Sequence, residues 1–309
     1  MNLQGATVAV TGASGMLGVY LCRSLLARGA NVRGVVRNPR KAPFLEAEGV
    51  TFATANLNDR DALTAAFRGC DAIVSNAALF SMTNQNWEAN YSANKTGTEN
   101  VYHAAHAAGV KRMVHISTFG VYRWRIWGAP KMAEDNPRLR GERGEMGPTR
   151  VYRATKNISE QLAWSLAKEF GMDLTVLRPT GVYGARDTQS LAAVRAFSRL
   201  PVLVLPAMYM PMTFGGDVGD AAAAALATDI SIGKAYNTGG DAHRITRFIS
   251  TWRRVNKHWF PLVIPLPTFG IGLRTDSSLA AAELGFRNRP FEEGMRELIE
   301  DEAKNPLAS

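Results

Sequence analysis

The sequence predicts an α/β fold in which helices cover both faces of a parallel sheet, with a smaller C-terminal lobe attached. Three observations predict it. Short apolar runs alternate with segments of helical spacing as far as residue 177. A glycine-rich turn joins the first apolar run, 6–10, to the first helical segment, 16–27. Beyond Arg178 and Pro179 the alternation weakens, as expected where an interleaved second lobe begins.

The glycine-rich turn has the composition of a phosphate-binding element. A first glycine allows the tight turn, a second lets the backbone approach a pyrophosphate, and a third lets helix and strand pack closely. The N-terminus of the following helix offers free N–H groups and a partial positive charge to an anion. We therefore expect a Rossmann-type doubly wound sheet whose first turn binds a dinucleotide through Gly12, Ser14, Gly15, Met16, Leu17 and Gly18.

The second predicted strand, 31–36, ends at Arg37, and Arg40 and Lys41 follow. An acidic residue at this strand end would bond the ribose 2′-hydroxyl of NAD, whereas a guanidinium can hold the 2′-phosphate of NADP through two hydrogen bonds. We therefore expect NADP(H) to be the preferred cofactor, with NAD(H) possible.

The later elements continue the alternation. Asp59 is a candidate N-cap for the helix that ends at Phe67, and small residues after the fourth strand would let a cofactor lie against the backbone. The segment 123–149 has no period and is long for a loop, so we expect a lid or a substrate loop there. Further strands are expected at 50–55, 71–75, 111–116, 173–177, 202–205 and 234–237, and further helices at 87–108, 151–170, 191–200 and 217–227.

These elements suggest a division into two parts. A dinucleotide-binding domain would comprise residues 1–178, with 217–240 returning to it. A substrate-binding lobe would comprise 179–216 and 241–309.

Charge and histidine spacing argue against two other kinds of partner. The net charge of the 309 residues is +9, but the basic residues are spread, and the nearest approach to a cluster, 138–150, also contains Glu142 and Glu145. An anionic cofactor accounts for this charge more simply than a nucleic acid. No metal is expected, because the histidines show no metal-ligand spacing with acids or cysteines.

Cysteine usage and the apolar segments bear on location. Cys22 and Cys70 both lie in apolar segments, which favours a reducing compartment, and no signal-peptide pattern follows Met1, so we expect a cytoplasmic protein. The longest apolar stretch, 259–273, contains three prolines and is too short to span a bilayer. We therefore expect no integral membrane segment, and favour a substrate-pocket wall for this stretch over a segment dipping into a membrane.

A candidate catalytic pair stands on the helix 151–170. Tyr152 and Lys156 are four residues apart, so both project from one helix face, and an ammonium beside a phenol lowers the tyrosine pKa from about 10 towards neutrality. Tyr91 and Lys95 have the same spacing, but they precede the strand whose end supplies Thr118, a hydroxyl that could bond the same substrate oxygen. We therefore expect Tyr152 to act as the general acid or base, and Tyr91 to have a packing role.

Seven segments in this order resemble the extended branch of the short-chain dehydrogenase/reductase family, which includes epimerases, dehydratases, dihydroflavonol-type reductases and hydroxysteroid dehydrogenases. The resemblance covers nearly the whole chain. It rests on the glycine turn 11–18, Asn94 to Thr98, His115 to Thr118 with Val121 and Tyr122, the Tyr152 to Lys156 motif, Leu177 to Gly184, Asp217 with Val218, and Glu283 to Phe286.

The resemblance implies roles for individual residues. Tyr152 would pass the proton, Lys156 would lower the tyrosine pKa and hold the nicotinamide ribose, and Thr118 would orient the substrate oxygen. The cofactor would transfer a hydride between its C4 and a carbinol carbon. The remaining cofactor contacts would come from Arg37 at the 2′-phosphate, Asn56 and Leu57 at the adenine, Ala77 and Ala78 under the cofactor, and Pro179 at the nicotinamide. A homodimer through helices 87–108 and 151–169 is also implied.

Departures from the family pattern narrow the reaction. Phe119 and Gly120 stand where dehydratases of the family keep an Asp-Glu pair, which argues against dehydration. The region 208–214 has no cation to clamp a substrate diphosphate, and its methionines suit either an apolar substrate or the core. Arg123, Arg125 or Arg153 could replace the missing clamp.

Three functions follow from these patterns. We favour an NADP-dependent carbonyl reductase or secondary-alcohol dehydrogenase acting on an apolar or amphipathic small molecule. A nucleotide-sugar epimerase that retains its cofactor is the enzymatic alternative. A non-catalytic NADP-binding sensor or scaffold is the alternative of another class, and the presence of Thr118, Tyr152 and Lys156 together argues against it.

Overall fold

A seven-stranded sheet, parallel throughout, forms the centre of the computed structural model, which describes residues 1–80, 86–140, 149–197, 200–240, 242–257 and 262–305. The spatial order β3-β2-β1-β4-β5-β7-β11 reverses between β1 and β4 and confirms the predicted doubly wound fold. The strands are β1 Thr7–Thr11, β2 Asn31–Val36, β3 Thr51–Thr54, β4 Ala72–Ser75, β5 Arg112–Ile116, β7 Asp173–Pro179 and β11 Ala235–Thr238.

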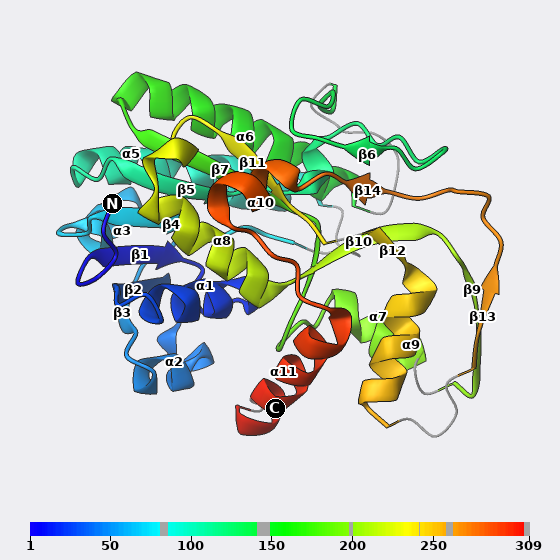
Figure 1. Ribbon diagram of the computed structural model, residues 1–309. Coiled ribbons are helices and arrows are strands. Elements are labelled where there is room, and N and C mark those ends of the chain that lie inside the picture. Colours follow the sequence, from blue (N-terminus) through cyan, green and yellow to red (C-terminus); the bar gives the residue numbers. More distant parts are fainter. Residues whose placement is uncertain (81–85, 141–148, 198–199, 241, 258–261, 306–309) are drawn as a thin grey trace.

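Helices cover both faces of this sheet (Figure 1). One face carries α1 Met16–Leu26, α8 Gly215–Ala227 and α10 Ser278–Leu284, and the other carries α3 Arg60–Phe67, α5 Gly97–Ala107 and α6 Arg150–Phe170. The short helices α2 Pro43–Ala47 and α4 Trp87–Tyr91, three 3-10 turns at 39–41, 119–121 and 229–231, and a π-helical turn, Ser92–Thr96, complete this part.

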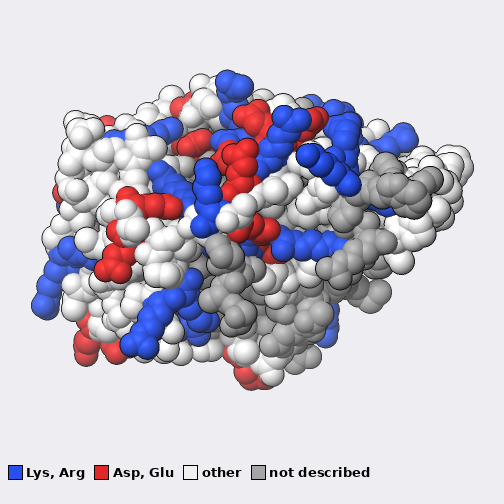
Figure 2. Space-filling view, turned by 90° about the horizontal axis from the view of Figure 1, so that it is seen from below, with Lys and Arg blue, Asp and Glu red and all other residues white. Residues whose placement is uncertain are grey.

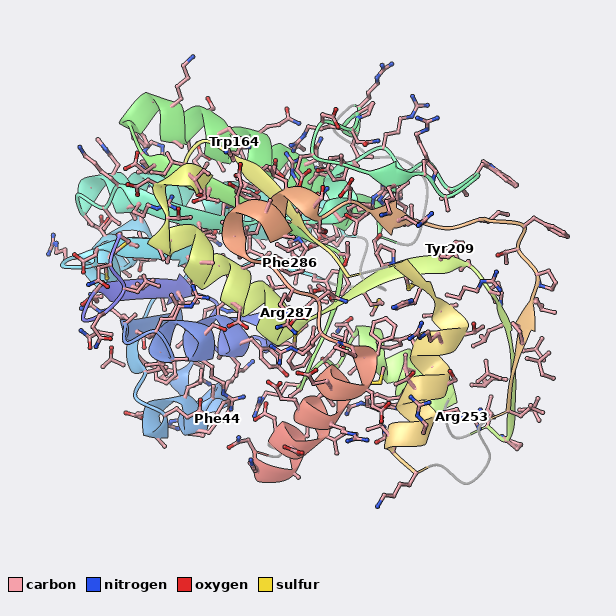
Figure 3. All side chains as sticks on the ribbon, viewed as in Figure 1. Phe44, Trp164, Tyr209, Arg253, Phe286 and Arg287 are labelled. Atoms are coloured by element: carbon pink, nitrogen blue, oxygen red, sulfur yellow. The ribbon has the colours of Figure 1, made fainter. Side chains whose placement is uncertain are left out.

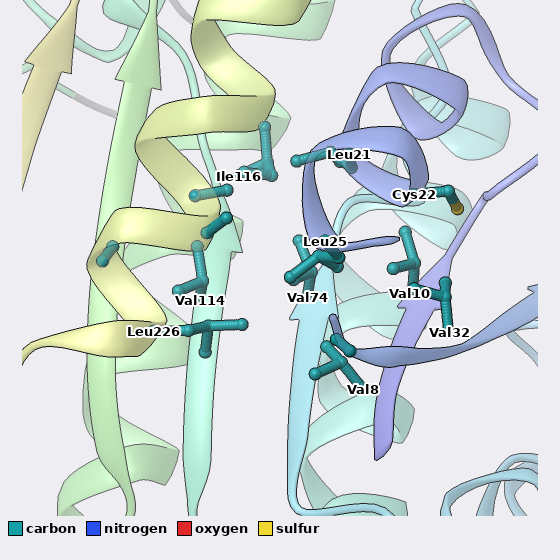
Figure 4. Close-up of a cluster of buried hydrophobic side chains, with 14 of the residues drawn as sticks. Val8, Val10, Leu21, Cys22, Leu25, Val32, Val74, Val114, Ile116 and Leu226 are labelled. Carbon is teal, nitrogen blue, oxygen red and sulfur yellow. The ribbon is translucent and has the colours of Figure 1, made fainter. Parts of the chain in front are cut away.

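The core between the sheet and α1 and α8 is continuous and apolar. Val8 and Val10 of β1, Leu21 and Leu25 of α1, and Leu226 of α8 are among its fully buried members (Figure 4). Strands of a parallel sheet are buried on both faces, and this is why they read as unbroken apolar runs in the sequence.

A smaller lobe with its own aromatic core follows. Tyr183, Phe214, Phe248 and Phe291 pack at 5.1–6.0 Å between ring centroids. Its elements are β8 Gly181–Tyr183, α7 Ser190–Phe197, β9 Val202–Pro206, β10 Tyr209–Phe214, β12 Ala242–Arg244, α9 Ile245–Val255, β13 Leu262–Leu266 and α11 Phe291–Lys304; β6 Lys131–Met132 pairs with β14 Arg274–Thr275.

The predicted elements match with small shifts. Asp59 caps α3 by accepting a hydrogen bond from the backbone N–H of Ala62 at 2.9 Å, and β11 adds the last strand of the sheet beside β7. The helix expected at 87–108 is divided by its π-helical turn. No helix among the described residues is long and apolar enough to cross a membrane. Residues 141–148 and 258–261, parts of two segments singled out in the sequence, lie outside the described residues.

Candidate active site

The carboxyl ends of β1 and β4 meet where the strand order reverses, the place where doubly wound folds bind ligands. The Thr11 hydroxyl accepts hydrogen bonds from the backbone N–H groups of Asn76 and Ala77, each at 3.0 Å. These bonds hold the segment after β4 beside the glycine-rich turn. The expected contacts Gly12 and Ala77 are therefore neighbours.

Two glycines of the turn are required by close contacts. Gly12 has φ +68°, a left-handed conformation that favours glycine, and a Cβ there would come within 3.0 Å of the Ala77 Cα. A Cβ on Gly18 would collide with the Gly12 carbonyl oxygen. These two glycines therefore let the turn pack tightly against the segment after β4 and against the start of α1.

The N-terminus of α1 is suited to an anion. Gly15 is its N-cap, no side chain caps it, and its first turn contains no acidic residue. Ser14, Met16 and Leu17 are partly buried around this helix end. The unbonded N–H groups of the first turn and the helix dipole can therefore both face a phosphate.

The remaining predicted cofactor residues lie at the carboxyl-terminal end of the sheet, because the carboxyl ends of parallel strands all lie on the same side. Arg37 follows β2 and is exposed, so its guanidinium is accessible to a phosphate. Leu57 packs against Gly97, Ala78 is exposed, and Pro179 is buried at the end of β7. Asn56 follows β3, is exposed, and accepts a hydrogen bond from the Asn58 backbone.

The structure brings Thr118 and Tyr152 together. Thr118 follows β5, and its hydroxyl lies beside the Tyr152 phenol, where it acts to lower the pKa of the phenol. The Phe80 ring packs edge-on against the Tyr152 ring at 4.9 Å between centroids. The lowered tyrosine pKa expected from the sequence is wrong for this structure: burial raises the pKa of Tyr152 to about 12, with the Thr118 hydroxyl acting in the opposite direction. The phenol therefore holds its proton at neutral pH.

Lys156 lies one turn further along α6 and is buried. Its ammonium donates a hydrogen bond of 2.7 Å to the Ile116 carbonyl at the end of β5, so this bond is to the backbone and not to the phenol. Burial lowers the pKa of Lys156 to about 8, while the Glu160 carboxylate acts to raise it. At neutral pH the site therefore contains a buried cation.

Glu160, fully buried one further turn along, was missed by the sequence reasoning. Its carboxylate accepts hydrogen bonds from Ser117 at 2.5 Å, and from the guanidinium groups of Arg178 at 2.7 Å and Arg138 at 2.5 Å. These cations hold the pKa of Glu160 at about 2 despite burial. The spacing Tyr152, Lys156, Glu160 placed it on the same helix face and could have identified it.

Asn94 is a second supporting residue, and it occupies the π-helical turn. Its side chain exchanges hydrogen bonds with the Leu79 backbone at 2.7 and 3.2 Å and donates one of 3.0 Å to the Thr155 hydroxyl of α6. It therefore fixes the segment after β4 against the helix that carries Tyr152. π-helical turns are frequent at functional sites, but no period in the sequence marks them.

The structure shows the surroundings of Arg153 and Met212, two residues considered for substrate binding. Arg153 is buried, donates hydrogen bonds to the carbonyls of Gly120 and Tyr122, and stacks on Trp124 at 3.6 Å, so it is no replacement diphosphate clamp. Met212 belongs to the core of the smaller lobe, and this favours core packing over a substrate contact for it. No cluster of metal-ligating side chains occurs among the described residues.

Several known proteins are similar to this chain. The model of the NAD dependent epimerase/dehydratase family matches residues 8–239. A 4-hydroxy-2-methyl-3-oxo-4-farnesyl-3,4-dihydroquinoline-1-oxide ketoreductase from Stigmatella aurantiaca is 37% identical over 59% of this chain and 52% of its own. Cinnamoyl-CoA reductase 1 of Petunia hybrida is 33% identical over 59% and 56%.

A solved structure extends the likeness over the whole fold. UDP-glucuronic acid 4-epimerase from Bacillus cereus, in complex with NAD, has a TM-score of 0.78 at 21% identity and covers 96% of this chain and 99% of its own. The two reductases, by contrast, are matched over only about half of their own length. The family match covers most of the chain and confirms the expected membership of an NAD(P)-dependent enzyme family: the chain belongs to the NAD dependent epimerase/dehydratase family.

Proposed function

We propose that this protein is an NADP-dependent oxidoreductase that reduces an apolar or amphipathic ketone, or oxidises the corresponding secondary alcohol. The observation that carries the proposal is the placement of the Thr118 hydroxyl beside the Tyr152 phenol, at the same carboxyl-terminal end of the sheet as the glycine-rich turn. The dinucleotide would be held by Gly12 to Gly18, Arg37, Asn56, Leu57, Ala77, Ala78, Lys156 and Pro179.

The state of Tyr152 suits the reductive direction. When bound, the nicotinamide supplies the hydride, and the substrate oxygen must then receive a proton. A phenol with a pKa of about 12 is protonated at neutral pH and can donate to an oxygen that becomes an alkoxide. The Thr118 hydroxyl can orient that oxygen, and the buried Lys156 ammonium stabilises negative charge that remains on the phenol.

Two observations support an apolar substrate. The name of the first relative contains a large apolar group, farnesyl, and no phosphate, whereas the second names cinnamoyl joined to CoA, which itself contains a diphosphate, so only the first supports an apolar substrate. The cation that would clamp a sugar nucleotide is missing from 208–214, and Arg153 is already engaged with backbone carbonyls. The other two candidates, Arg123 and Arg125, are exposed. A buried diphosphate without a cationic partner would be costly.

The test is a substrate panel followed by NADPH absorbance together with product analysis. Ketones, aldehydes, acyl-CoA thioesters and sugar nucleotides are compared, and we expect NADPH oxidation with an apolar ketone. An epimerised sugar nucleotide without net change in absorbance would replace this proposal by the epimerase alternative. Binding of NADPH without turnover on any compound would favour the sensor or scaffold.

The cofactor preference is tested at Arg37. Arg37→Asp places a carboxylate where the 2′-phosphate would bind, so we expect NADPH affinity to fall by about 10- to 100-fold with little change for NADH. Arg28→Asp, an exposed arginine after α1, is the control. An unchanged NADPH to NADH ratio would contradict the NADP preference.

We also propose a homodimer and a division of the chain into two parts. The helices at 87–108 and 151–169 lie side by side in the outer layer of the sheet (Figure 1) and would pair with the same helices of a second copy. Light scattering at several concentrations tests the dimer. The dinucleotide-binding domain would comprise 1–178 with 217–240, and the substrate lobe 179–216 with 241–309.

A further inference from the structure

We propose that the smaller lobe binds to the surface of an anionic lipid bilayer. Positive charge is unevenly distributed along the sequence of this lobe. Residues 188–216 and 242–275 contain eight Lys and Arg residues and no Asp or Glu. The lobe as a whole, 179–216 with 241–309, contains 13 Lys and Arg against 10 Asp and Glu, and six of these acidic residues lie on α11. The positive charge is therefore local to the two segments that contain no acidic residue.

The same segments contain an exposed apolar surface, which includes the described part of 259–273. The sequence favoured a substrate-pocket wall for this stretch, but Leu262, Ile264 and Phe269 are exposed, and this favours the membrane alternative. Strands β9 and β13 form a separate parallel ribbon, and one face of it packs on α9 through Leu203 and Val263. The apolar side chains that leave this core are 41–53% exposed; they are Val202, Val204, Leu262, Ile264 and Leu266. Figure 2 shows white surface at the right-hand end of the molecule, where this ribbon lies in Figure 1, with Lys and Arg side chains nearby.

Two aromatic residues extend this surface on adjacent loops. Phe269 is 96% exposed and has φ +46°, an unfavourable backbone conformation for a phenylalanine, and Trp127 is 77% exposed. The two loops are joined, because the Gly272 N–H donates a hydrogen bond of 2.9 Å to the Ile126 carbonyl. Large apolar side chains gathered at the surface mark a place where another apolar phase binds.

Cationic side chains stand beside this apolar surface. A cavity of about 400 Å³ lies between β13 and the N-terminal end of α9 and is lined in part by Arg244, Arg247, His243 and Tyr209. Arg244 and Arg247 are exposed, and no salt bridge in the described part of the chain includes either. Tyr209, which bridges to Gly272, links this cavity to the loop that carries Phe269 (Figure 3).

Charge decides between the possible occupants. A second copy of this chain, packed symmetrically through this ribbon, would bring Arg244 and Arg247 close to the same arginines of the other copy, which is unfavourable. A nucleic acid would use the positive charge and leave the apolar side chains in water. An anionic bilayer satisfies both, because the lipid phosphates pair with arginines and the apolar side chains enter the acyl boundary.

Part of the positive charge of the smaller lobe is neutralised by ion pairs with acidic residues of the same lobe. Arg195 and Arg254 pair with Glu302 and Glu292 of α11. The attraction to lipid therefore depends on the exposed arginines beside β13, Arg244 and Arg247, rather than on the whole lobe.

The test is co-sedimentation of the full chain with vesicles of phosphatidylcholine alone or with one third phosphatidylglycerol. We expect binding to the anionic vesicles to be about tenfold tighter or more, and to weaken as NaCl is added. Failure to bind the anionic vesicles would overturn the proposal.

Matched variants assign the binding to this surface. Trp127→Ser with Phe269→Ser removes the exposed aromatic side chains, and we expect partitioning to fall by about tenfold or more. Ile230→Ser, which changes a half-exposed apolar residue far from the ribbon in sequence, is the control and should bind as the wild type does. Equal binding of the aromatic variant and its control would overturn the proposal.

A charge pair separates the electrostatic contribution. Arg244→Gln with Arg247→Gln should remove about tenfold of the preference for anionic vesicles, whereas Arg28→Gln with Lys168→Gln, an exposed pair in the larger part, should not. Light scattering of the aromatic variant completes the test. Conversion of a dimer to a monomer, with vesicle binding unchanged, would identify the surface as a contact between copies and overturn the proposal.

Discussion

Two Tyr-x-x-x-Lys pairs in this molecule have the same spacing and different surroundings. Tyr152 and Lys156 lie on α6, where the phenol lies beside the Thr118 hydroxyl and the buried ammonium donates a hydrogen bond to the Ile116 carbonyl. Tyr91 and Lys95 are both partly exposed, and the Lys95 ammonium lies 5.9 Å from the centre of the Tyr91 ring.

The carboxylates one turn further along differ in the same way. Glu160 is fully buried and paired with two arginines, whereas Glu99 is partly exposed and paired with Lys95 at 2.7 Å. The comparison shows that the Tyr-x-x-x-Lys spacing alone does not make a catalytic pair. The groups at the end of the strand that the pair faces decide its chemistry. Only the α6 pair faces a hydroxyl and a carbonyl at the end of β5.

The largest expected effect separates the two tyrosines. Tyr152→Phe removes the proton donor, so we expect kcat to fall by about 10³-fold while NADPH binding is unchanged. Tyr91→Phe should retain kcat within about twofold, since the phenyl ring keeps the packing. Absorbance assays give kcat, and a fluorescence titration gives NADPH affinity. Equal kcat values for the two variants would remove Tyr152 from its role.

The second effect separates the two carboxylates by stability. Glu160→Gln leaves the buried Arg178 without its counter-charge, and we expect the free energy of unfolding to fall by about 3–5 kcal/mol. Glu99→Gln breaks a partly exposed pair and should cost less than about 1 kcal/mol. Urea unfolding at pH 7 measures both. Similar losses would show that burial does not distinguish the two pairs.

The buried Glu160 carboxylate also predicts that the free energy of unfolding falls at acidic pH. The pKa of Glu160, about 2, is depressed below its unfolded value of about 4.3, so its contribution is complete above the unfolded value and is lost as pH falls towards 2. The wild type should therefore lose stability between pH 5 and 3 more steeply than Glu160→Gln. Parallel pH profiles for the two proteins would contradict this assignment.

Much of this site could be predicted from the sequence, because each part has a local signal. The glycines of the first turn, the strand end at Thr118 and the Tyr152–Lys156 spacing need only short-range patterns, and the structure gathers them because parallel strands end at one edge. The family match then confirmed the resemblance carried by these segments.

What could not be predicted depends on contacts between distant segments. Glu160 becomes significant only when Arg138 and Arg178 meet over it. Asn94 belongs to a segment that carries the family resemblance, but its contacts with Leu79 and Thr155 depend on the π-helical turn and had no signal in the sequence. The direction of the Tyr152 pKa shift could not be predicted either, because it follows from burial, and the Lys156 ammonium is bonded to the Ile116 carbonyl.

The smallest expected effect is on the pH dependence of kcat/KM, which should distinguish Lys156 from Lys95. Burial lowers the pKa of Lys156 to about 8, so the ammonium charge of Lys156 is present below that pH and lost above it. The pKa of Lys95 is instead raised by its hydrogen bond to Glu99. If turnover uses the charged form of Lys156, kcat/KM should fall about tenfold per pH unit above pH 8, before the phenol of Tyr152 titrates. Lys95→Met should keep this limb, and Lys156→Arg, which stays charged, should lose it. A limb that persists in Lys156→Arg would assign the titration to another group.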